Sequence, residues 1–457
     1  MREALVSSLT LMAHAFGQTY NLPVPLWLFM FGGAATVIVS FILASLLVDV
    51  KRARVSYPKR MYRTIPSIAV KVSLWVATAT YLIVIAGGIV GSQSFISNIS
   101  PTLFCVLLLI ALAHVSILAG NIWQFINPFS RILDVIEVLV GKKIEPRFVY
   151  PRQLRYVPAL AVYFWFVWLE LLSYGWGVVP LNLSVILLVY GVATIVGATA
   201  YGREAWFRYG DFFSVFFGLF SKVAPFEYVE NKIYLRQPVV SLLSKANLSP
   251  IFLFFVLFML SSTAFDGLRE TAAYLSISQF ITSLPLFSGL DSHLLDTMIL
   301  LISPFIFFAV YWVCIVAMKH LVRSSYSVMY LAKQFILTLV PIAIAYNVAH
   351  YFTVTLIQGQ LLIKLISDPF GLGWNLFHTA NYTINAGIID AASVWYIQVA
   401  LIIAGHIAAI YLAHLVALKT FVGTKQVLLS QYPMLALMVV YTMTSLWIIS
   451  QSIIAAT

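Results

Sequence analysis

The chain has 457 residues, of which 61% are apolar and 9% are charged. Soluble domains average about 45–50% apolar and about 25% charged residues, so this composition excludes a soluble globular domain and predicts an integral membrane protein. The net charge of +11 does not indicate a nucleic-acid-binding protein, because the basic residues fall in a few short connections between apolar segments.

Residues 1–25 allow two interpretations, a cleaved signal peptide or a retained surface helix. A signal peptide begins with positive charge, but here Arg2 is offset by Glu3, and cleavage after Ala15 would remove His14. An apolar stripe at helical spacing suits a helix lying on the membrane surface. Its members are Leu5, Leu9, Met12 and Phe16. We expect the segment to be retained on the outer surface.

Ten segments predict membrane-spanning helices, each of which needs about 20 mostly apolar residues. We therefore expect an all-α polytopic transmembrane bundle of about ten spans, forming one integral membrane domain over residues 1–457. Five spans in each half would have opposite orientations, which permits an inverted repeat. The expected spans are 26–48, 70–90, 101–119, 157–177, 181–200, 250–268, 294–316, 335–357, 393–418 and 433–454.

The basic residues predict how these spans are oriented. All of the 27 Lys and Arg residues except Arg2, Arg269 and Lys364 follow the odd-numbered spans or lie at their edges. Cytoplasmic connections are rich in Lys and Arg, so the pattern predicts that both termini lie outside the cytoplasm. We expect a multi-pass protein of the cytoplasmic (inner) membrane.

Three connections are long enough to form additional structure. Residues 121–156 and 201–249 are expected to be cytoplasmic interfacial segments that include amphipathic helices, with 203–223 either interfacial or shallowly re-entrant. Within the second segment, Glu204 and Asp211 lie among Arg203 and Arg208 and are interpreted as part of a solvated or interfacial ion-pair cluster. Residues 358–392 carry Pro and Gly without a helical period and are expected to form an outer lid loop.

Imidazole and carboxylate groups are expected to gather at the outer face. The sixth span ends at Asp266, the eighth carries Tyr346, Asn347 and His350 on one helical face, and the lid and amino-terminal segment add further groups. Such donors suit Zn or Cu, and three of them with an open position would form a catalytic metal site. The alternative is that each is a hydrogen-bonded residue at a helix boundary. The tentative metal ligands are His14, His350, His378, Asp266 and Asp368.

Other polar residues lie within expected spans, where ionisable groups are costly and often functional. For the three histidines among them, the alternatives are interhelical hydrogen bonds or a proton path. These intramembrane residues are Glu170, Asn347, His114, His406 and His414.

The chain resembles a family of bacterial multi-pass membrane proteins catalogued as fenitrothion hydrolase. The resemblance covers most of the first 270 residues, in order, and rests on "AHAFGQTYNLPVPLWLF", "NIWQFINPFSRI", "REAWFRYGDFFSVFFGLFSKVAPFE" and "SSTAFDGLRE". It implies hydrolysis of an organophosphate triester. Metal-assisted hydrolysis would need a metal-bound hydroxide, for which the five tentative ligands are the candidates.

Three classes of function therefore remain open. The chain could be such a hydrolase, a carrier for a metal ion or small polar solute, or an assembly subunit of a larger membrane complex. The lipid bilayer is the expected partner, and nucleic acid is not. Walker A, dinucleotide-binding, GxSxG and c-type haem motifs are absent, and Cys105 and Cys314 do not form a CxxC pair.

Overall fold

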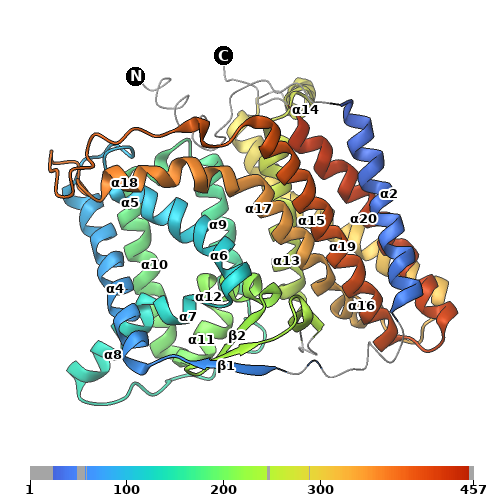
Figure 1. Cartoon of the computed structure of the whole chain (residues 1–457), viewed down its shortest axis with the longest axis horizontal. Coiled ribbons are helices and arrows are strands. Elements are labelled where there is room, and N and C mark those ends of the chain that lie inside the picture. Colours follow the sequence, from blue (N-terminus) through green and yellow to red (C-terminus); the bar gives the residue numbers. More distant parts are fainter. Residues whose placement is uncertain (1–23, 49–56, 58, 244–247, 288, 452–457) are drawn as a thin grey trace. The chain divides into compact units, whose positions relative to one another are not determined.

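The computed structural model describes residues 24–48, 57, 59–243, 248–287 and 289–451 and is 75% helical (Figure 1). Among these residues, nine helical segments are long and apolar enough to cross a membrane. The fold is therefore compatible with the integral membrane protein that the composition predicts. The expected surface helix within 1–25, with His14, lies outside the described residues apart from its last two positions.

Nine of the ten expected spans coincide with these nine segments, with differences at the ends. The tenth, 157–177, corresponds to α9 (Val157–Leu172), a helix of 16 residues. This helix stops early because Tyr174 and Gly175 both adopt positive φ angles, of 48° and 79°. With 16 residues, α9 is shorter than the roughly 20 residues that a membrane-spanning helix needs.

The chain forms two compact units. Unit 1 comprises described residues between 58 and 238 and between 352 and 388, and unit 2 comprises those between 16 and 57, 239 and 351, and 389 and 457. The units therefore do not correspond to the first and second five expected spans.

Unit 1 is a helical bundle with α18 at one end and a small sheet at the other (Figure 1). Its helices are α4 (Ser67–Val90), α5 (Ile99–Pro101), the π-helix η1 (Thr102–Ala111), α6 (Leu112–Ala119), α7 (Trp123–Ile126), α8 (Pro128–Val140), α9, η2 (Trp176–Val178), α10 (Pro180–Tyr201), α11 (Arg203–Tyr209), α12 (Phe212–Phe220), η3 (Ser221–Val223), η6 (Gln358–Gln360), α18 (Leu361–Leu365) and η7 (Ala386–Ile388).

Helices α4 and α10 pack closely in unit 1. A Cβ added to Gly88 would lie 2.2 Å from the carbonyl oxygen of Pro180, so only glycine allows this approach. Nearby, the Tyr81 hydroxyl donates to the carbonyl of Leu187 at 2.8 Å. The glycine thus brings the two helices together where polar side chains can satisfy backbone groups.

The three-stranded antiparallel sheet of unit 1 departs from the expected all-α fold. Its order is β1 (Arg60–Thr64), β3 (Lys232–Leu235) and β2 (Phe226–Val229). Glu227 accepts from Lys59 at 2.8 Å and pairs with Arg236 at 3.2 Å. The strands are four or five residues long; β2 and β3 pair across a two-residue turn, whereas β1 comes from a segment far away in the sequence.

The segment of residues 358–392 is helical at its start and irregular afterwards. Residues 358–365 form η6 and α18, and the loop that follows is tied to the rest of unit 1 by backbone bonds. Ser92 N–H donates to the Phe370 carbonyl at 2.7 Å, and Ile99 N–H donates to that of Pro369 at 2.9 Å. The loop therefore lies against the end of α4 and the start of α5.

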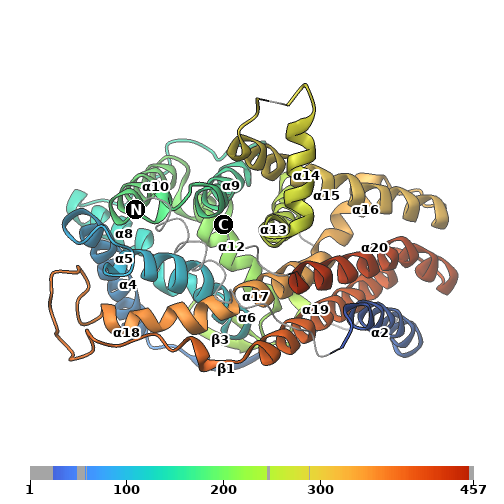
Figure 2. The same ribbon diagram turned by 90° about the horizontal axis from the view of Figure 1, so that it is seen from above.

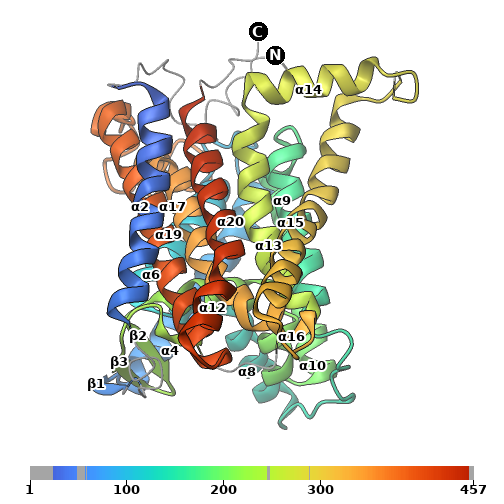
Figure 3. The same cartoon turned by 90° about the vertical axis from the view of Figure 1, so that its right-hand side faces the viewer.

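Unit 2 contains most of the longest helices, with α2, α19 and α20 packed against one another (Figures 2 and 3). Its elements are α2 (Leu26–Leu47), η4 (Val240–Leu243), α13 (Pro250–Arg269), α14 (Ala272–Ser283), α15 (Ser292–Val322), α16 (Val328–Phe335), η5 (Ile336–Leu339), α17 (Val340–Ile357, up to residue 351), α19 (Ala391–Thr420) and α20 (Thr424–Ser450).

Helix α14 lies across one end of α13 and α15 (Figure 3). We call this the acidic end of unit 2, because Asp266, Glu270, Asp291 and Asp296 lie at the adjoining helix ends. The opposite ends of the long helices carry Lys319, Arg323, Lys419 and Lys425. The two ends of unit 2 therefore differ in charge, as the counts of basic residues predict.

Candidate functional site

The candidate site is a carboxylate and its partners near the acidic end of unit 2. Asp266 lies in the last turn of α13, after the hydroxyl residues at 261–263, and is 4% exposed. In the most apolar stretch of α13, 78% of residues are buried, the largest share among the nine spans of the described chain. Asp266 thus faces the packed interior of unit 2, where an ionised group requires partners.

Helix α17 supplies two of these partners. The Nε2 atom of His350 lies 2.8 Å from Oδ2 of Asp266, and the Tyr351 hydroxyl donates to the same oxygen at 2.6 Å. The side chains of His350 and Asp266 are 9% and 5% exposed. One carboxylate oxygen therefore contacts both an imidazole and a phenol, in an environment that strengthens polar interactions.

Gly267 allows α17 and α20 to approach α13 at this site. A Cβ added there would lie 2.7 Å from Cγ2 of Ile448, 3.1 Å from the Tyr346 hydroxyl and 3.6 Å from Cε1 of His350. The first distance is below normal contact, so a larger residue would displace α20. The smallest residue of α13 therefore stands beside its buried carboxylate.

Further charged groups surround Asp266. Nη2 of Arg269 lies 3.7 Å from Oε1 of Glu270, and the Tyr274 hydroxyl donates to Oδ1 of Asp296 at 2.5 Å. Burial raises the pKa of Glu270 above its ordinary value; Arg269 opposes the rise and Asp266 adds to it. Several carboxylates thus lie near one arginine and one histidine, which favours cations at this end of unit 2.

The tentative metal ligands are only partly brought together. Asp266 and His350 are paired, whereas Asp368 and His378 belong to unit 1. Asp368 accepts from the backbone N–H groups of Leu372 and Gly373 at 2.9 and 2.8 Å, and His378 is exposed. Within the described ranges, no group of three or more His, Cys, Asp or Glu residues could hold a metal ion. These residues alone do not fit a three-ligand site.

The intramembrane polar residues occupy different environments. Glu170 is on the exposed face of α9, and Asn347 is half-buried on α17. His414 is buried, with its ring nitrogens 3.1 Å from Oε1 of Gln431 and 3.1 Å from the Val48 carbonyl oxygen. Hydrogen bonds thus account for both ring nitrogens of His414.

His406 and His114 are less completely satisfied. Nδ1 of His406 lies 2.8 Å from the Ile402 carbonyl oxygen, within the same helix. The Nε2 atoms of both His406 and His114 are buried without a hydrogen-bond partner. The two residues belong to different units, and no hydrogen bond connects His406 with His414 in the described residues. No proton path follows from their positions.

A second buried carboxylate corrects the expected ion-pair cluster. Asp211 is 0% exposed and caps α12; the Tyr190 hydroxyl donates to Oδ1, and Ser214 donates its N–H and hydroxyl to Oδ2. Arg203 pairs with Asp134 at 2.8 Å instead. The available sequence signal was the mostly apolar segment 212–220 directly after Asp211, because a helix buried on all sides also encloses its amino-terminal cap.

Asp211 lies in the two-residue connection between α11 and α12 of unit 1. Trp206 of α11 packs on Gly197 of α10, where an added Cβ would lie 2.4 Å from the indole. Tyr190 is about three helical turns before the end of α10, or roughly 16 Å along its axis. Asp211 therefore lies beside the middle of α10 and not at its end.

Comparisons with known proteins identify no relative. No family model matches the chain, and neither does any curated protein or solved structure.

Proposed function

We propose that this protein is a membrane carrier for a small cation, and that Asp266, His350 and Tyr351 bind the cation and a proton in turn. The observation that carries the proposal is the 2.8 Å contact between a buried carboxylate and a buried imidazole on two helices of one unit. Ionisable groups inside a membrane bundle characteristically mark ion pathways and proton relays.

The geometry supplies a reason for coupling. A cation that binds Oδ2 of Asp266 must replace the donors from His350 and Tyr351, which already contact that oxygen. A protonated imidazole is attracted to the carboxylate and repels an incoming cation. A neutral imidazole has no net charge, so both effects are weaker. Cation binding is therefore linked to release of a proton from this group of side chains.

The charge distribution supports the sign of the cargo. Glu270 interacts electrostatically with two other carboxylates, Asp266 and Asp296. It also interacts with two groups that favour its ionised form, Arg269 and His350. We infer that the acidic end of unit 2 faces the outside of the cytoplasmic membrane, because cytoplasmic connections are rich in Lys and Arg. Cations would then enter the site from outside the cell.

The organophosphate hydrolase suggested by the family resemblance requires more ligands than the described residues provide here. A metal-bound hydroxide needs a preformed donor set, and this site offers Asp266 and His350. His14 lies outside the described residues. We therefore place the carrier first and use the hydrolase, together with a subunit role in a larger complex, as contrasting outcomes.

The test is cation-driven proton movement in proteoliposomes that contain a pH dye. We expect Zn²⁺ or Mn²⁺ gradients to move protons with the wild type, and Asp266→Asn or His350→Gln to abolish this movement. Asp291→Asn is the matched control, because it removes an exposed acid at the same end of unit 2. Variants are compared only when they elute as monodisperse protein.

Two results would overturn the carrier. One is an absence of any cation-driven proton movement by the wild type, and the other is equal movement by Asp266→Asn. Metal-dependent turnover of a chromogenic phosphotriester that disappears in His350→Gln would favour the hydrolase. Absence of both activities, with co-purification of a stoichiometric membrane partner, would favour the subunit role.

A further inference from the structure

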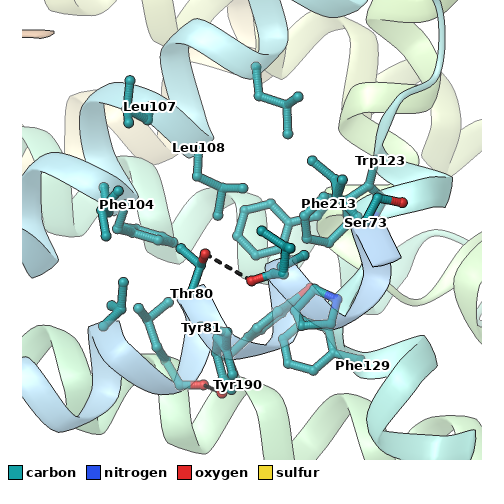
Figure 4. A pocket seen from close by; sticks show the side chains of 18 of the residues that line it. Ser73, Thr80, Tyr81, Phe104, Leu107, Leu108, Trp123, Phe129, Tyr190 and Phe213 are labelled. Atoms are coloured by element: carbon teal, nitrogen blue, oxygen red, sulfur yellow. Dashed lines mark hydrogen bonds between the residues drawn. The ribbon is translucent and has the colours of Figure 1, made fainter. Parts of the chain in front are cut away.

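Unit 1 contains a cavity of about 570 Å³ whose walls come from α4, η1, α6, α7, α8, α10 and α12 (Figure 4). Ligand sites in proteins have volumes of about 300–1,000 Å³ and are mostly apolar. Along α4 the lining extends from Ala69 to Val84, which corresponds to roughly 22 Å of helix. The cavity is therefore long enough for an extended ligand.

The cavity wall has no spare hydrogen-bond donor. Each hydroxyl or indole N–H among the lining side chains donates to another group of unit 1. Thr80 donates to the Val76 carbonyl at 2.9 Å, a bond visible in Figure 4. The other donors and acceptors are Ser73 to the Phe125 carbonyl, Tyr81 to the Leu187 carbonyl, Trp123 to the Ser214 hydroxyl and Tyr190 to the Asp211 carboxylate. Such a wall suits hydrocarbon better than a polar molecule.

The buried carboxylate explains how the aromatic wall is held in place. Tyr190 and Trp123 both line the cavity; Tyr190 bonds Asp211 directly, and Trp123 bonds it through Ser214 at 3.1 Å. Phe213, in the first turn of α12, completes this side. The polar atoms thus turn away from the cavity, and the rings present their apolar surfaces to it.

The wall opposite α4 is a π-helix. Leu103, Phe104, Leu107 and Leu108 of η1 all line the cavity. Such helices are rare and mostly single-turn bulges, which are frequent at functional sites; η1 is longer and extends over ten residues. An element of this kind beside a cavity supports a binding role for the cavity.

The cavity is accessible from the surface of α4. Val72 and Val76 line it and are nevertheless 52% and 58% exposed. Only 11% of the most apolar stretch of α4 is buried, so this span presents most of its surface to lipid. A lipid chain next to α4 could enter without first crossing water.

We propose that this cavity binds one hydrocarbon chain of a membrane lipid. The apolar wall, the satisfied donors and the opening on a lipid-facing helix select this occupant over a soluble metabolite. The proposal concerns unit 1 and does not depend on the cation site of unit 2.

The first test compares two substitutions on α4. Ala77 lines the cavity, whereas Ala79, two residues later, is exposed and does not. Lipid that remains bound after detergent purification is extracted and counted by mass spectrometry. We expect about one tightly held lipid per chain for the wild type and Ala79→Phe, and about tenfold less for Ala77→Phe, because the added ring fills the cavity. Equal retention by both variants would overturn the proposal.

The second test uses the wild type, so it does not depend on the folding of a variant. The protein is illuminated in vesicles of phosphatidylethanolamine that carries a diazirine at the end of one acyl chain. Phe104 and Phe129 line the cavity but are 5% and 2% exposed, whereas Val189 on α10 is 59% exposed. Labelling of Phe104 or Phe129 supports an inserted chain, and labelling confined to exposed residues such as Val189 contradicts it.

Discussion

The two buried carboxylates of this protein have different kinds of partner. Asp211 in unit 1 accepts hydrogen bonds from a phenol, a hydroxyl and a backbone N–H, and it caps α12. Asp266 in unit 2 shares one oxygen between a phenol and the imidazole of His350. Histidine changes its charge near physiological pH, whereas the partners of Asp211 do not.

Under the proposed function, this difference separates a structural acid from one that takes part in transport. The environment of Asp211 holds the start of α12 and the aromatic wall of a cavity, and none of its partners exchanges a proton near neutral pH. The environment of Asp266 contains a partner that can exchange a proton. Burial alone therefore does not distinguish the two acids, whereas the chemistry of their partners does.

The largest expected effect is that of Asp211→Ala. The substitution leaves the Tyr190 hydroxyl and the Ser214 N–H without their acceptor, and we expect a loss of about 2–5 kcal/mol in the free energy of unfolding. Denaturant unfolding in detergent measures it. Asp134→Ala is the control, because its partly exposed ion pairs contribute about 1 kcal/mol or less. Similar losses in both variants would show that Asp211 has no special structural role.

Asp266→Asn should destabilise the protein less. Asparagine keeps the shape and one acceptor oxygen, so we expect a loss of about 1–3 kcal/mol in the same unfolding experiment. Transport should nevertheless be abolished, because the titratable pair is gone. A variant that unfolds as readily as Asp211→Ala would assign Asp266 a mainly structural role and remove the contrast between the two acids.

The two phenols provide a matched pair of substitutions. Tyr190 is 5% exposed and Tyr351 is half-buried, and each donates one hydrogen bond to a carboxylate. We expect Tyr190→Phe to lower the free energy of unfolding by about 1.5–2 kcal/mol and Tyr351→Phe by about 1 kcal/mol. Thermal unfolding followed by fluorescence would reveal the order, and a reversed order would count against the structural role of the Asp211 cluster.

The smallest expected effect is a pH dependence at Glu270. Burial raises the pKa of this carboxyl in the folded chain, so folding favours its protonated form and stability falls as pH rises above the ordinary carboxyl value. Glu270→Gln removes this loss, and its melting temperature relative to wild type should be higher at about pH 7 than at about pH 4. Glu204→Gln, at an exposed acid on α11, is the control. A relative melting temperature that stays constant or falls with pH would contradict the assigned direction.

Local pattern predicted part of the candidate site. Tyr346 and His350 recur at helical spacing, and Asp266 follows a polar turn at the end of an apolar segment, so their shared end of the bundle could be predicted. The structure adds the contact between Asp266 and His350. Tyr351 was missed because it lies next to His350 and outside the helical face that drew attention. Gly267 had no visible role until α20 was seen beside it.

Hydropathy by itself predicted the membrane class and the positions of the nine described helical segments that are long and apolar enough to cross a membrane, because a helix that crosses lipid must satisfy its backbone internally and cover about 20 residues with apolar side chains. Only the tertiary structure decided which spans belong together and which acids are buried. Those outcomes depend on contacts between residues far apart in sequence, such as Tyr190 with Asp211, Pro180 with Gly88, and the strands that pair residues 60–64 with 232–235. The sequence pattern shows which side chains of a segment must be buried, whereas the tertiary packing determines which other segments cover them.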